Sequence, residues 1–515
     1  MTTNLYIDTR GKHEHPVTFT EALIKGLADG GGLFVPESIP HFTRNEILSL
    51  ASMPYAKRAA FVYKALNPDL DASLIDELME KTYGDRFDTE EICPITSLDE
   101  TTHILELWHG PTSAFKDMAL QCLPHFFNAS AEKLRTEGKL DTSFLILVAT
   151  SGDTGKAALE GFKDQDNIRI AVMYPDGGVS DIQYKQMATQ EGNNVMVWAV
   201  GGNFDDCQTG AKRVFNDEAF NEKLAESYHV ALSSANSINW GRLLPQIVYY
   251  LSSYAQLVKD GKLEAGATLD VCVPTGNFGN ILAAWYAKQM GAPLGTLFCA
   301  SNENRVLTDF INTGVYDISQ RDFVLTPSPS MDILVSSNME RQLFELTGRN
   351  AEAIRQWMDD LSQKKAFSVD EDTLQKLQAD FASDSVDNAT CLKTIKDVFE
   401  TYHYLIDPHT AVAVKVAENL RTENPVLIAS TAHWAKFGEN VYRALHDIEL
   451  GGQLPEDVAA LSGCDLNNKI ADETGDHNIP EGLAKLDSMP IRFTDTIQGS
   501  LESIEDAVQA FISKE

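Results

Sequence analysis

A chain of 515 residues, of which 43% are hydrophobic, is long enough for about three domains and has ample residues for a core. Its 42 Lys+Arg and 75 Asp+Glu give a formal net charge of −33. This balance argues against non-specific binding to nucleic acid or anionic membranes, because both need basic patches. An anionic substrate would need a local basic pocket.

The N-terminus and the cysteines predict the compartment. The first residues lack a basic segment followed by an apolar run, so we expect no signal peptide. No apolar run approaches the ~20 residues that span a bilayer. The seven cysteines are scattered and form no Cys-x-x-Cys pair, as expected where thiols stay reduced. We therefore expect a soluble, cytoplasmic protein without a membrane partner or a metal site.

The first 92 residues predict a mainly helical domain, with helices at 20–28, 44–52, 55–66 and 72–82. From residue 93 onward, short apolar runs alternate with helical segments, which is typical of parallel sheets covered on both faces. Expected strands cover residues 103–108, 143–150, 168–174, 195–200, 269–273, 296–300 and 425–430. Expected helices cover residues 118–135, 156–163, 182–191, 207–215, 243–259 and 281–289.

The last third of the chain has a different pattern. Residues 340–404 are charged and predict further helices. The region from residue 445 onward is acidic and more weakly patterned, and it ends in an expected amphipathic helix at 501–512.

One lysine stands where a strand changes to a helix. Lys116 follows Ala114 and Phe115 and precedes a mostly apolar segment, so its side chain is expected to point inward. A lysine in a partly apolar pocket loses its proton more readily than the ordinary pKa of about 10.4 implies. That favours an amine able to form a Schiff base. Taken alone, however, the stretch fits a structural lysine paired with a carboxylate better than a reactive one.

Two more strand–loop–helix junctions share this design, at residues 150–155 and 274–280. Their glycines permit close approach of the backbone to a ligand, and a helix start offers free N–H groups to a phosphate or carboxylate. Ligands of open α/β sheets lie beyond the carboxyl ends of the strands, so all three loops can face one cleft. Each loop alone is an ordinary tight turn, but together they predict a site for more than one anionic group. Neither has the spacing of a nucleotide-binding loop.

Two polar segments complete the candidates. Ser430 and Thr431 directly follow an apolar strand, where the alternative is a simple strand-ending turn. Residues 233–242 gather hydroxyls, amides and Arg242 with little acid nearby. A second phosphate would suit that segment, and the alternative is an ordinary polar loop.

Together these motifs resemble the threonine synthases, a family of fold-type II pyridoxal-phosphate enzymes. The resemblance covers most of the chain. The loop 276–280, combined with His109-Gly110-Pro111-Thr112 and Phe115-Lys116-Asp117, is its most specific part. Other matching blocks are Thr9-Arg10-Gly11, Ser151-Gly152-Asp153-Thr154-Gly155, residues 236–242, Ser330-Met331-Asp332-Ile333, Ser336-Ser337-Asn338 and Ser430-Thr431-Ala432-His433. Two residues depart from the family pattern: Trp434 stands where a proline is expected, and Ser113 where an aliphatic residue is more usual. Both changes affect the local geometry of their loops, and neither removes a functional group.

The resemblance implies a fold-type II α/β architecture of two open, twisted parallel-sheet lobes plus a helical N-terminal domain. The implied domains are residues 1–92, a cofactor-binding core at 93–450 with its smaller lobe at about 140–235, and an acidic segment at 451–515 that packs on the core. A monomer or homodimer is expected.

The resemblance also assigns residues to pyridoxal phosphate. Lys116, beside Phe115, would hold the cofactor covalently and later move protons. The implied cradle for the cofactor phosphate is Gly276, Asn277, Phe278, Gly279 and Asn280. Thr431, or Ser430 beside it, would hydrogen-bond the pyridine nitrogen. A hydroxyl cannot keep that nitrogen protonated as an aspartate does, which implies a milder electron sink.

The implied reaction converts O-phospho-L-homoserine and water to L-threonine and phosphate by β,γ-elimination and water addition, the last step of threonine biosynthesis. The residues implied to line the substrate site are His109, Thr112, Ser151, Asp153, Thr154, Asn236, Ser237 and Arg242. Within that set, residues 151–154 would bind the α-carboxylate and residues 236–242 the phosphate. The alternatives are another fold-type II lyase, such as a threonine or serine dehydratase, and a catalytically silent homologue that binds a metabolite.

Overall fold

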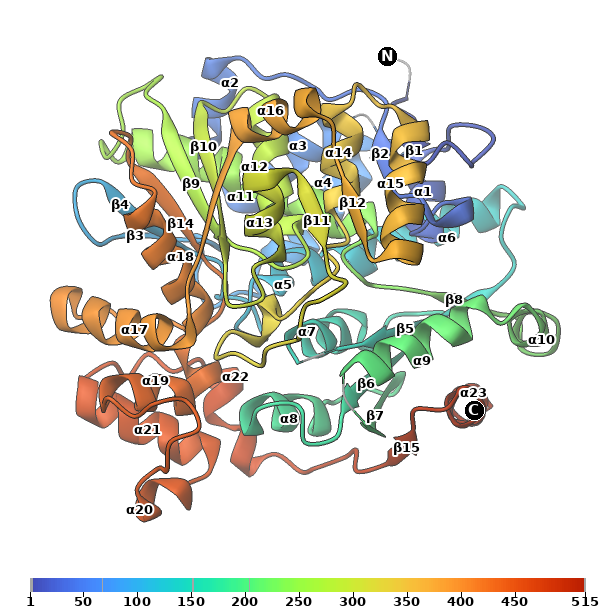
Figure 1. Cartoon of the computed structure of the whole chain (residues 1–515). Helices are drawn as coiled ribbons and strands as arrows, with labels where there is room; N and C mark the ends of the chain where they lie inside the picture. The colour runs from blue at the N-terminus through green and yellow to red at the C-terminus, as the bar shows by residue number, and fades with distance from the viewer. Residues whose placement is uncertain (1–2, 67, 151, 203, 514–515) are drawn as a thin grey trace.

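Two separate sheets divide the molecule into a larger and a smaller lobe (Figure 1). The structure is a computed structural model that describes residues 3–66, 68–150, 152–202 and 204–513. The larger sheet has the strand order β13-β10-β9-β14-β4-β3, and within it β3 alone runs antiparallel to its neighbour. Its strands are β3 (Ile95–Ser97), β4 (Thr102–Glu106), β9 (Leu269–Pro274), β10 (Leu294–Ser301), β13 (Phe381–Ser385) and β14 (Val426–Ser430).

The smaller sheet is parallel throughout, with the order β15-β7-β6-β5-β8. Its strands are β5 (Ser143–Ala149), β6 (Ile168–Pro175), β7 (Val195–Gly201), β8 (Val230–Ser233) and β15 (Thr496–Gln498). Its main covering helices are α7 (Asp153–Phe162), α8 (Asp181–Ala188), α9 (Phe204–Asn216), α10 (Glu218–Tyr228) and α23 (Leu501–Ile512). Because α7 packs on one face and α9 on the other, β5 and β6 are apolar along nearly their whole length.

The N-terminal helices share one apolar core with the larger lobe. They are α1 (Phe19–Lys25), α2 (Arg44–Ser49), α3 (Tyr55–Ala65) and α4 (Ala72–Tyr83), and they accompany the antiparallel pair β1 (Tyr6–Asp8) and β2 (Phe34–Pro36). These helices pack on α6 (Leu123–Thr136) and α11 (Trp240–Lys259). Most side chains of α11 are buried, which explains why its sequence is apolar on nearly every face.

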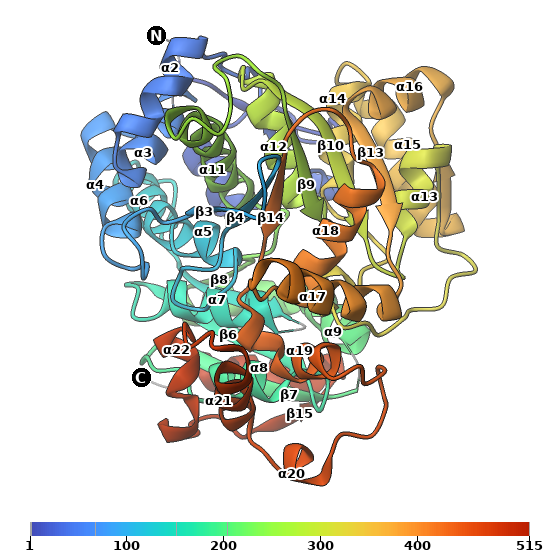
Figure 2. The ribbon, with the colours of Figure 1, turned by 90° about the vertical axis from the view of Figure 1, so that its left-hand side faces the viewer.

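The remaining helices cover the larger sheet and build the C-terminal region. They are α5 (Lys116–Leu120), α12 (Gly279–Gln289), α13 (Val306–Thr313), α14 (Met339–Leu346), α15 (Ala351–Lys364), α16 (Glu371–Asp380), α17 (Asn388–Tyr402), α18 (Pro408–Asn419), α19 (Gly438–Leu445), α20 (Glu456–Ala459), α21 (Gly463–Thr474) and α22 (Glu481–Ala484). Strands β11 (Val315–Asp317) and β12 (Ala366–Ser368) form a small antiparallel pair. Figure 2 shows α19, α21 and α22 beside α8 of the smaller lobe. No helix among the described residues is long and apolar enough to cross a membrane.

The structure corrects several sequence expectations. All seven predicted strands are present, but β3, β8, β13 and β15 were not predicted, and all four are sheet edges. The helix expected at 118–135 is two helices, α5 and α6, because Pro124 in the first turn of α6 has no N–H to continue the preceding helix. The region 340–404 is not purely helical, since it contains β12 and β13. The N-terminal region likewise contains β1 and β2.

Candidate active site

The predicted loops meet because of strand order. Strands β9, β14 and β4 are neighbours in the larger sheet, so the loops that follow them leave the same edge side by side. These loops contain three of the candidate groups: residues 276–280, Ser430 with Thr431, and the approach to Lys116. The fourth loop follows β5 of the smaller lobe and reaches them from the opposite side through Asp153.

Lys116 opens α5 beside the segment that follows β14. The Phe115 N–H donates to Thr431 O at 2.8 Å and the His433 N–H donates to Ser113 O at 3.1 Å, so the two segments run antiparallel. Lys116 is half-buried, and its Nζ lies 4.6 Å from the centre of the Phe115 ring. The amine is therefore placed where the loops after β4 and β14 meet.

The surroundings of Lys116 favour its neutral form. Burial is the main cause that lowers the pKa of this amine to about 8, the nearby charge of Asp153 opposes the shift, and Arg242 and Lys436 add to it. About a tenth of an amine with this pKa is neutral at pH 7, far more than for an ordinary lysine, and the neutral form can act as a nucleophile and a base. The charged neighbours that shift the pKa of Lys116 are therefore Asp153, Arg242 and Lys436, and the sequence alone does not identify them.

The turn after β9 has no space for larger side chains. A Cβ at Gly276 would lie 3.0 Å from Ser330 O, so the backbone there is packed closely. Asn277 follows Gly276, and Phe278 caps α12 in the left-handed conformation at φ 61°. Gly279 and Asn280 then begin the helix, whose first N–H groups suit a phosphate.

Among the candidate site residues, two buried nitrogens lack a hydrogen-bond partner within the described part of the chain: Asn280 Nδ2 and Arg242 Nε. The Oδ1 of Asn280 accepts from Tyr249 Oη at 2.9 Å, so the amide is held with its other end free. Buried polar groups are normally paired, because an unpaired donor loses its hydration without compensation. Both nitrogens are therefore suited to a bound ligand.

Arg242 is 3% exposed, and its Nη1 donates to Ala235 O at 2.5 Å. Burial lowers the pKa of Arg242 to about 10. Ser237 Oγ lies 3.3 Å from Ser337 Oγ, and the Asn236 N–H donates to the Ser234 hydroxyl at 3.2 Å. Segment 236–242 therefore combines hydroxyls and amides on a loop with a buried guanidinium in the first turn of α11.

The smaller-lobe loop is organised by Thr150, whose Oγ1 accepts from the N–H groups of Gly152 and Gly155. Of the candidates on this loop, Ser151 lies outside the described residues, and Thr154 is half-buried in the first turn of α7. Asp153 is buried. Burial alone would raise the pKa of Asp153, but the positive charges around it hold that pKa far below its usual value.

His109 and Thr112 form part of the loop before Lys116. Burial by itself would lower the pKa of His109, but hydrogen bonds to Asp88 and Glu106, at 2.5 and 2.8 Å, raise it to about 9. The Thr112 N–H and hydroxyl both donate to Asp117 at 2.8 Å. The loop is thus fixed by contacts to three carboxylates, of which Glu106 and Asp117 are buried and Asp88 is exposed.

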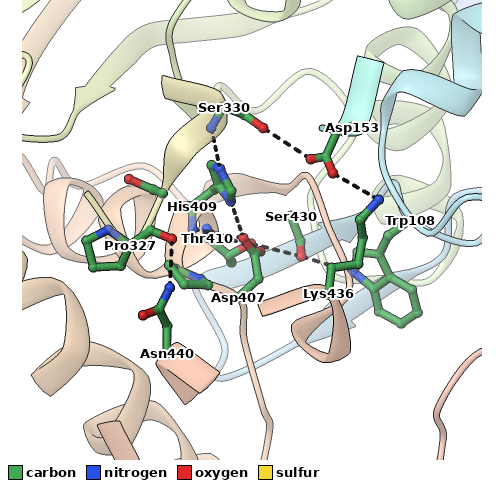
Figure 3. Close-up of polar contacts among 12 residues, drawn as sticks. Trp108, Asp153, Pro327, Ser330, Asp407, His409, Thr410, Ser430, Lys436 and Asn440 are labelled. Carbon is green, nitrogen blue, oxygen red and sulfur yellow. Dashed lines mark hydrogen bonds and ion pairs between the residues drawn. The ribbon is translucent and has the colours of Figure 1, made fainter. Parts of the chain in front are cut away.

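Ser430 and Thr431 differ in their contacts. Ser430 Oγ accepts from Trp108 Nε1 at 3.1 Å and lies 3.0 Å from Thr410 Oγ1 (Figure 3). The single proton of the Thr410 hydroxyl goes to the Asp407 carboxylate, so in this arrangement the Ser430 hydroxyl donates to Thr410. Thr431 is buried and contributes its carbonyl to the Phe115 contact.

Three families match successive parts of the chain. Residues 5–83 match the family described as threonine synthase N terminus, residues 100–430 that of the pyridoxal-phosphate dependent enzymes, and residues 410–508 that described as threonine synthase, C-terminal. The chain is also 38% identical over 500 residues to threonine synthase of Eremothecium gossypii, which covers 91% of this chain and 95% of that one. The chain belongs to the threonine synthase family.

Solved structures of the family have the same fold. The structure of PLP-bound threonine synthase from Brucella melitensis matches with a TM-score of 0.85 at 34% identity, covering 99% of this chain and 100% of that one. Threonine synthase from yeast matches with a TM-score of 0.85 at 32% identity, covering 99% of both chains. These likenesses confirm the predicted fold-type II α/β class. Human threonine synthase-like 1 is 44% identical over 438 residues, which is 83% of this chain, but this chain spans only 58% of that protein's length.

The sequence patterns did not single out Lys436 as a site residue of this threonine synthase family member. Lys436 is fully buried, and its Nζ lies 2.9 Å from Asp153 Oδ1 (Figure 3). It also donates to Thr112 O at 2.8 Å. The Ser330 hydroxyl donates to Asp153 Oδ2 at 3.1 Å, and His409 accepts from the Ser330 N–H at 3.1 Å. The available signal was the setting of Lys436 between Ala435 and Phe437, since it matches the apolar setting of Lys116.

Proposed function

We propose that the chain converts O-phospho-L-homoserine and water to L-threonine and phosphate, with pyridoxal phosphate held at Lys116. The observation that carries the proposal is Arg242, a buried guanidinium without a carboxylate partner in the described part of the chain, close enough to lower the pKa of Lys116. The buried Nε of Arg242 also has no hydrogen-bond partner among the described residues, and a substrate phosphate beside the reactive amine would supply both an acceptor and a negative charge. Threonine and serine, the substrates of a dehydratase, contain no phosphate group that could pair with Arg242.

Pyridoxal phosphate fits the residues present. The closely packed turn at Gly276, the start of α12 and the free Asn280 amide suit its phosphate, and the amine of Lys116 suits its aldehyde. The Thr431 hydroxyl would donate to the ring nitrogen, and Ser430 is the alternative donor if its proton turns away from Thr410. The bound cofactor supplies an electron sink for the pair left when a C–H bond beside the substrate amino group breaks.

Each site residue has its own role in the proposed reaction. Lys116 removes a proton from Cα and returns protons as the reaction proceeds, which a pKa near 8 allows in both directions. Arg242, with Asn236 and Ser237, binds the phosphate and stabilises its charge as it leaves Cγ. The burial that lowers the pKa of Lys116 also limits access of bulk water to these proton transfers.

The substrate carboxylate is assigned to the start of α7. The side chain of Asp153 is occupied, because it accepts from Lys436, Gln183 and Ser330. Its carboxylate therefore does not compete for the site, and the N–H groups of Asp153 and Thr154, together with the Thr154 hydroxyl, remain to bind an anion. His109 and Thr112 form the neighbouring wall.

Cell location, assembly and domains are part of the proposal. All seven cysteines are free and buried, which supports a reducing compartment such as the cytoplasm. We infer a monomer or homodimer that acts on a small molecule, and a division into residues 1–92, 93–450 and 451–515. The shared core of the N-terminal helices and the larger lobe supports joint folding of the first two parts.

The test is a direct assay. The purified holoenzyme is incubated with O-phospho-L-homoserine, and phosphate and threonine are measured together. Equal amounts of the two products are expected. Ammonia release from threonine or serine without phosphate release would favour the dehydratase alternative, and no turnover of any of these substrates would favour the silent homologue.

A further inference from the structure

The segment 336–341 contacts both candidate anion loops. The Ser336 hydroxyl donates to Gly276 O at 2.7 Å, and both the N–H and the side-chain amide of Asn338 donate to Asn277 O at 3.1 Å. The Ser337 hydroxyl lies 3.3 Å from Ser237 Oγ in the other loop. One short segment therefore connects the turn assigned to the cofactor phosphate with the loop assigned to the substrate phosphate.

Arg341 is the buried centre of this connection. Its Nη1 donates to Asn338 Oδ1 at 2.6 Å, its Nη2 to Ile238 O at 2.5 Å and its Nε to Phe34 O at 3.0 Å. The side chain has no exposed surface, and its guanidinium carbon lies 5.9 Å from the centre of the Trp240 ring. The three acceptors belong to the cofactor-side segment, the substrate-side loop and β2 of the N-terminal region.

The N-terminal region also anchors the residue next to Arg341. The Thr9 hydroxyl donates to Glu340 Oε1 at 2.6 Å, and Arg10 forms a two-point contact with the same carboxylate at 2.9 and 2.7 Å. The side-chain amide of Asn239 in the substrate-side loop donates to Leu23 O at 2.9 Å. The Thr9-Arg10-Gly11 block found in the sequence therefore contacts the start of α14 rather than a ligand.

We propose that Arg341 is a positioning residue that sets the distance and orientation between the two anion loops, using β2 of the N-terminal region as its fixed point. The inference rests on the proposed function for the identity of the two anions. A planar guanidinium holds three acceptors in fixed directions at once, whereas a lysine ammonium is a single point on a flexible chain. Arg341→Lys therefore keeps the charge and removes the three-way geometry.

Arg349 provides a matched control. It lies just beyond α14 and donates to Glu37 O at 2.7 Å and to Pro36 O at 3.1 Å, so it also joins this part of the chain to the end of β2. Its remaining contact is the carboxylate of Glu345. Arg349→Lys thus removes a comparable link to β2 without touching either anion loop.

The first measurement compares cofactor affinities. The apoenzyme of each variant is titrated with pyridoxal phosphate and, separately, with pyridoxal, which lacks the phosphate. We expect Arg341→Lys to weaken binding of pyridoxal phosphate by about tenfold or more while pyridoxal binding stays within about twofold, because only the phosphate contacts the misplaced turn. Arg349→Lys should leave both affinities close to those of the native chain. An equal loss for both ligands, or no loss for either, would overturn the proposal.

The second measurement is kinetic, on the holoenzyme saturated with cofactor. Arg341→Lys should raise KM for O-phospho-L-homoserine by about tenfold and lower kcat less, because the phosphate loop is displaced more than the amine. A loss confined to kcat would contradict the role in the substrate loop. If the native holoenzyme releases no phosphate, the proposed function fails, and the ratio of cofactor affinities alone decides the role of Arg341.

A loss of cofactor binding must not come from misfolding of the variant. Thermal unfolding of all apoenzymes is recorded beside the titrations. If Arg341→Lys does not fold, Asn338→Ala replaces it, since Asn338 is the side chain through which Arg341 reaches the cofactor turn. A selective loss of pyridoxal phosphate over pyridoxal in that variant supports the proposal, and unchanged selectivity overturns it.

Discussion

The ammonium of Lys436 and the carboxylate of Asp153 form an ion pair with an N–O distance of 2.9 Å and almost no exposed surface on either side chain. Lys436 follows β14 of the larger sheet, and Asp153 is the first residue of α7 in the smaller lobe (Figure 3). The two lobes are therefore joined by charge at the edge of the proposed active site.

Removing one partner of this pair should be costly. Lys436→Met leaves Asp153 buried and without its main counterion, and we expect the free energy of unfolding to fall by about 3–5 kcal/mol. The double variant with Asp153→Asn should lose less than the sum of the two single variants, as measured by denaturant unfolding. Lys393→Ala, which breaks an exposed pair with Asp397, should cost under about 1 kcal/mol. Additive losses at the buried pair would show that the pair is not coupled.

Lys116 should be the site of covalent attachment. Borohydride reduction of the holoenzyme followed by peptide mapping should place the label on Lys116. Lys116→Ala should still bind pyridoxal phosphate weakly through the turn at 276–280, but its kcat should fall by more than about a thousandfold, because the amine that moves protons is gone. Lys156→Ala, whose ammonium pairs with Glu160 on α7, should keep the label on Lys116. A label on any other lysine would refute the assignment.

The pH dependence of cofactor attachment should report the pKa of Lys116. Only the neutral amine attacks an aldehyde, so the rate at which the apoenzyme takes up pyridoxal phosphate should rise with pH, with a midpoint near 8. Arg242→Gln removes a positive charge that lowers this pKa, and the midpoint should move to higher pH. A midpoint that moves downward, or stays in place, would contradict the electrostatic account of Lys116.

Stability at alkaline pH should depend on His109. Its folded-state pKa of about 9 exceeds the unfolded value of about 6.5, so its charged form stabilises the fold fully below pH 6.5. That contribution is lost as pH rises through 9. It amounts to at most about 3 kcal/mol, reduced by solvent screening at the half-exposed Asp88. His109→Gln should flatten the unfolding free energy between pH 6.5 and 9, whereas an unchanged slope would assign that pH dependence to other groups.

Within the two large sheets, the strands that the sequence predicted lie in the interior, and the strands that it missed lie at the edges. The interior strands, such as β5 and β9, lie between two neighbours and under two layers of helices, so they must be continuous apolar runs that stand out in the sequence. Edge strands such as β13 and β15 pair on one side only, and their sequences, Phe-Ala-Ser-Asp-Ser and Thr-Ile-Gln, contain no such run. Helix α23 was predicted with its observed bounds because its apolar face repeats at helical spacing.

The sequence by itself determined the fold class, the family and the list of candidate groups, because strand–loop–helix junctions and a lysine in an apolar setting are local patterns. Only the tertiary structure decided which groups are free and which are occupied. Arg242 and Asp153 are both buried charges, yet Asp153 is neutralised by Lys436, which lies 283 positions further along the chain, whereas Arg242 has no such partner among the described residues. Arg341 likewise acts through the carbonyls of Phe34 and Ile238. Backbone carbonyls are the same at every position, so no residue pattern reveals contacts of that kind.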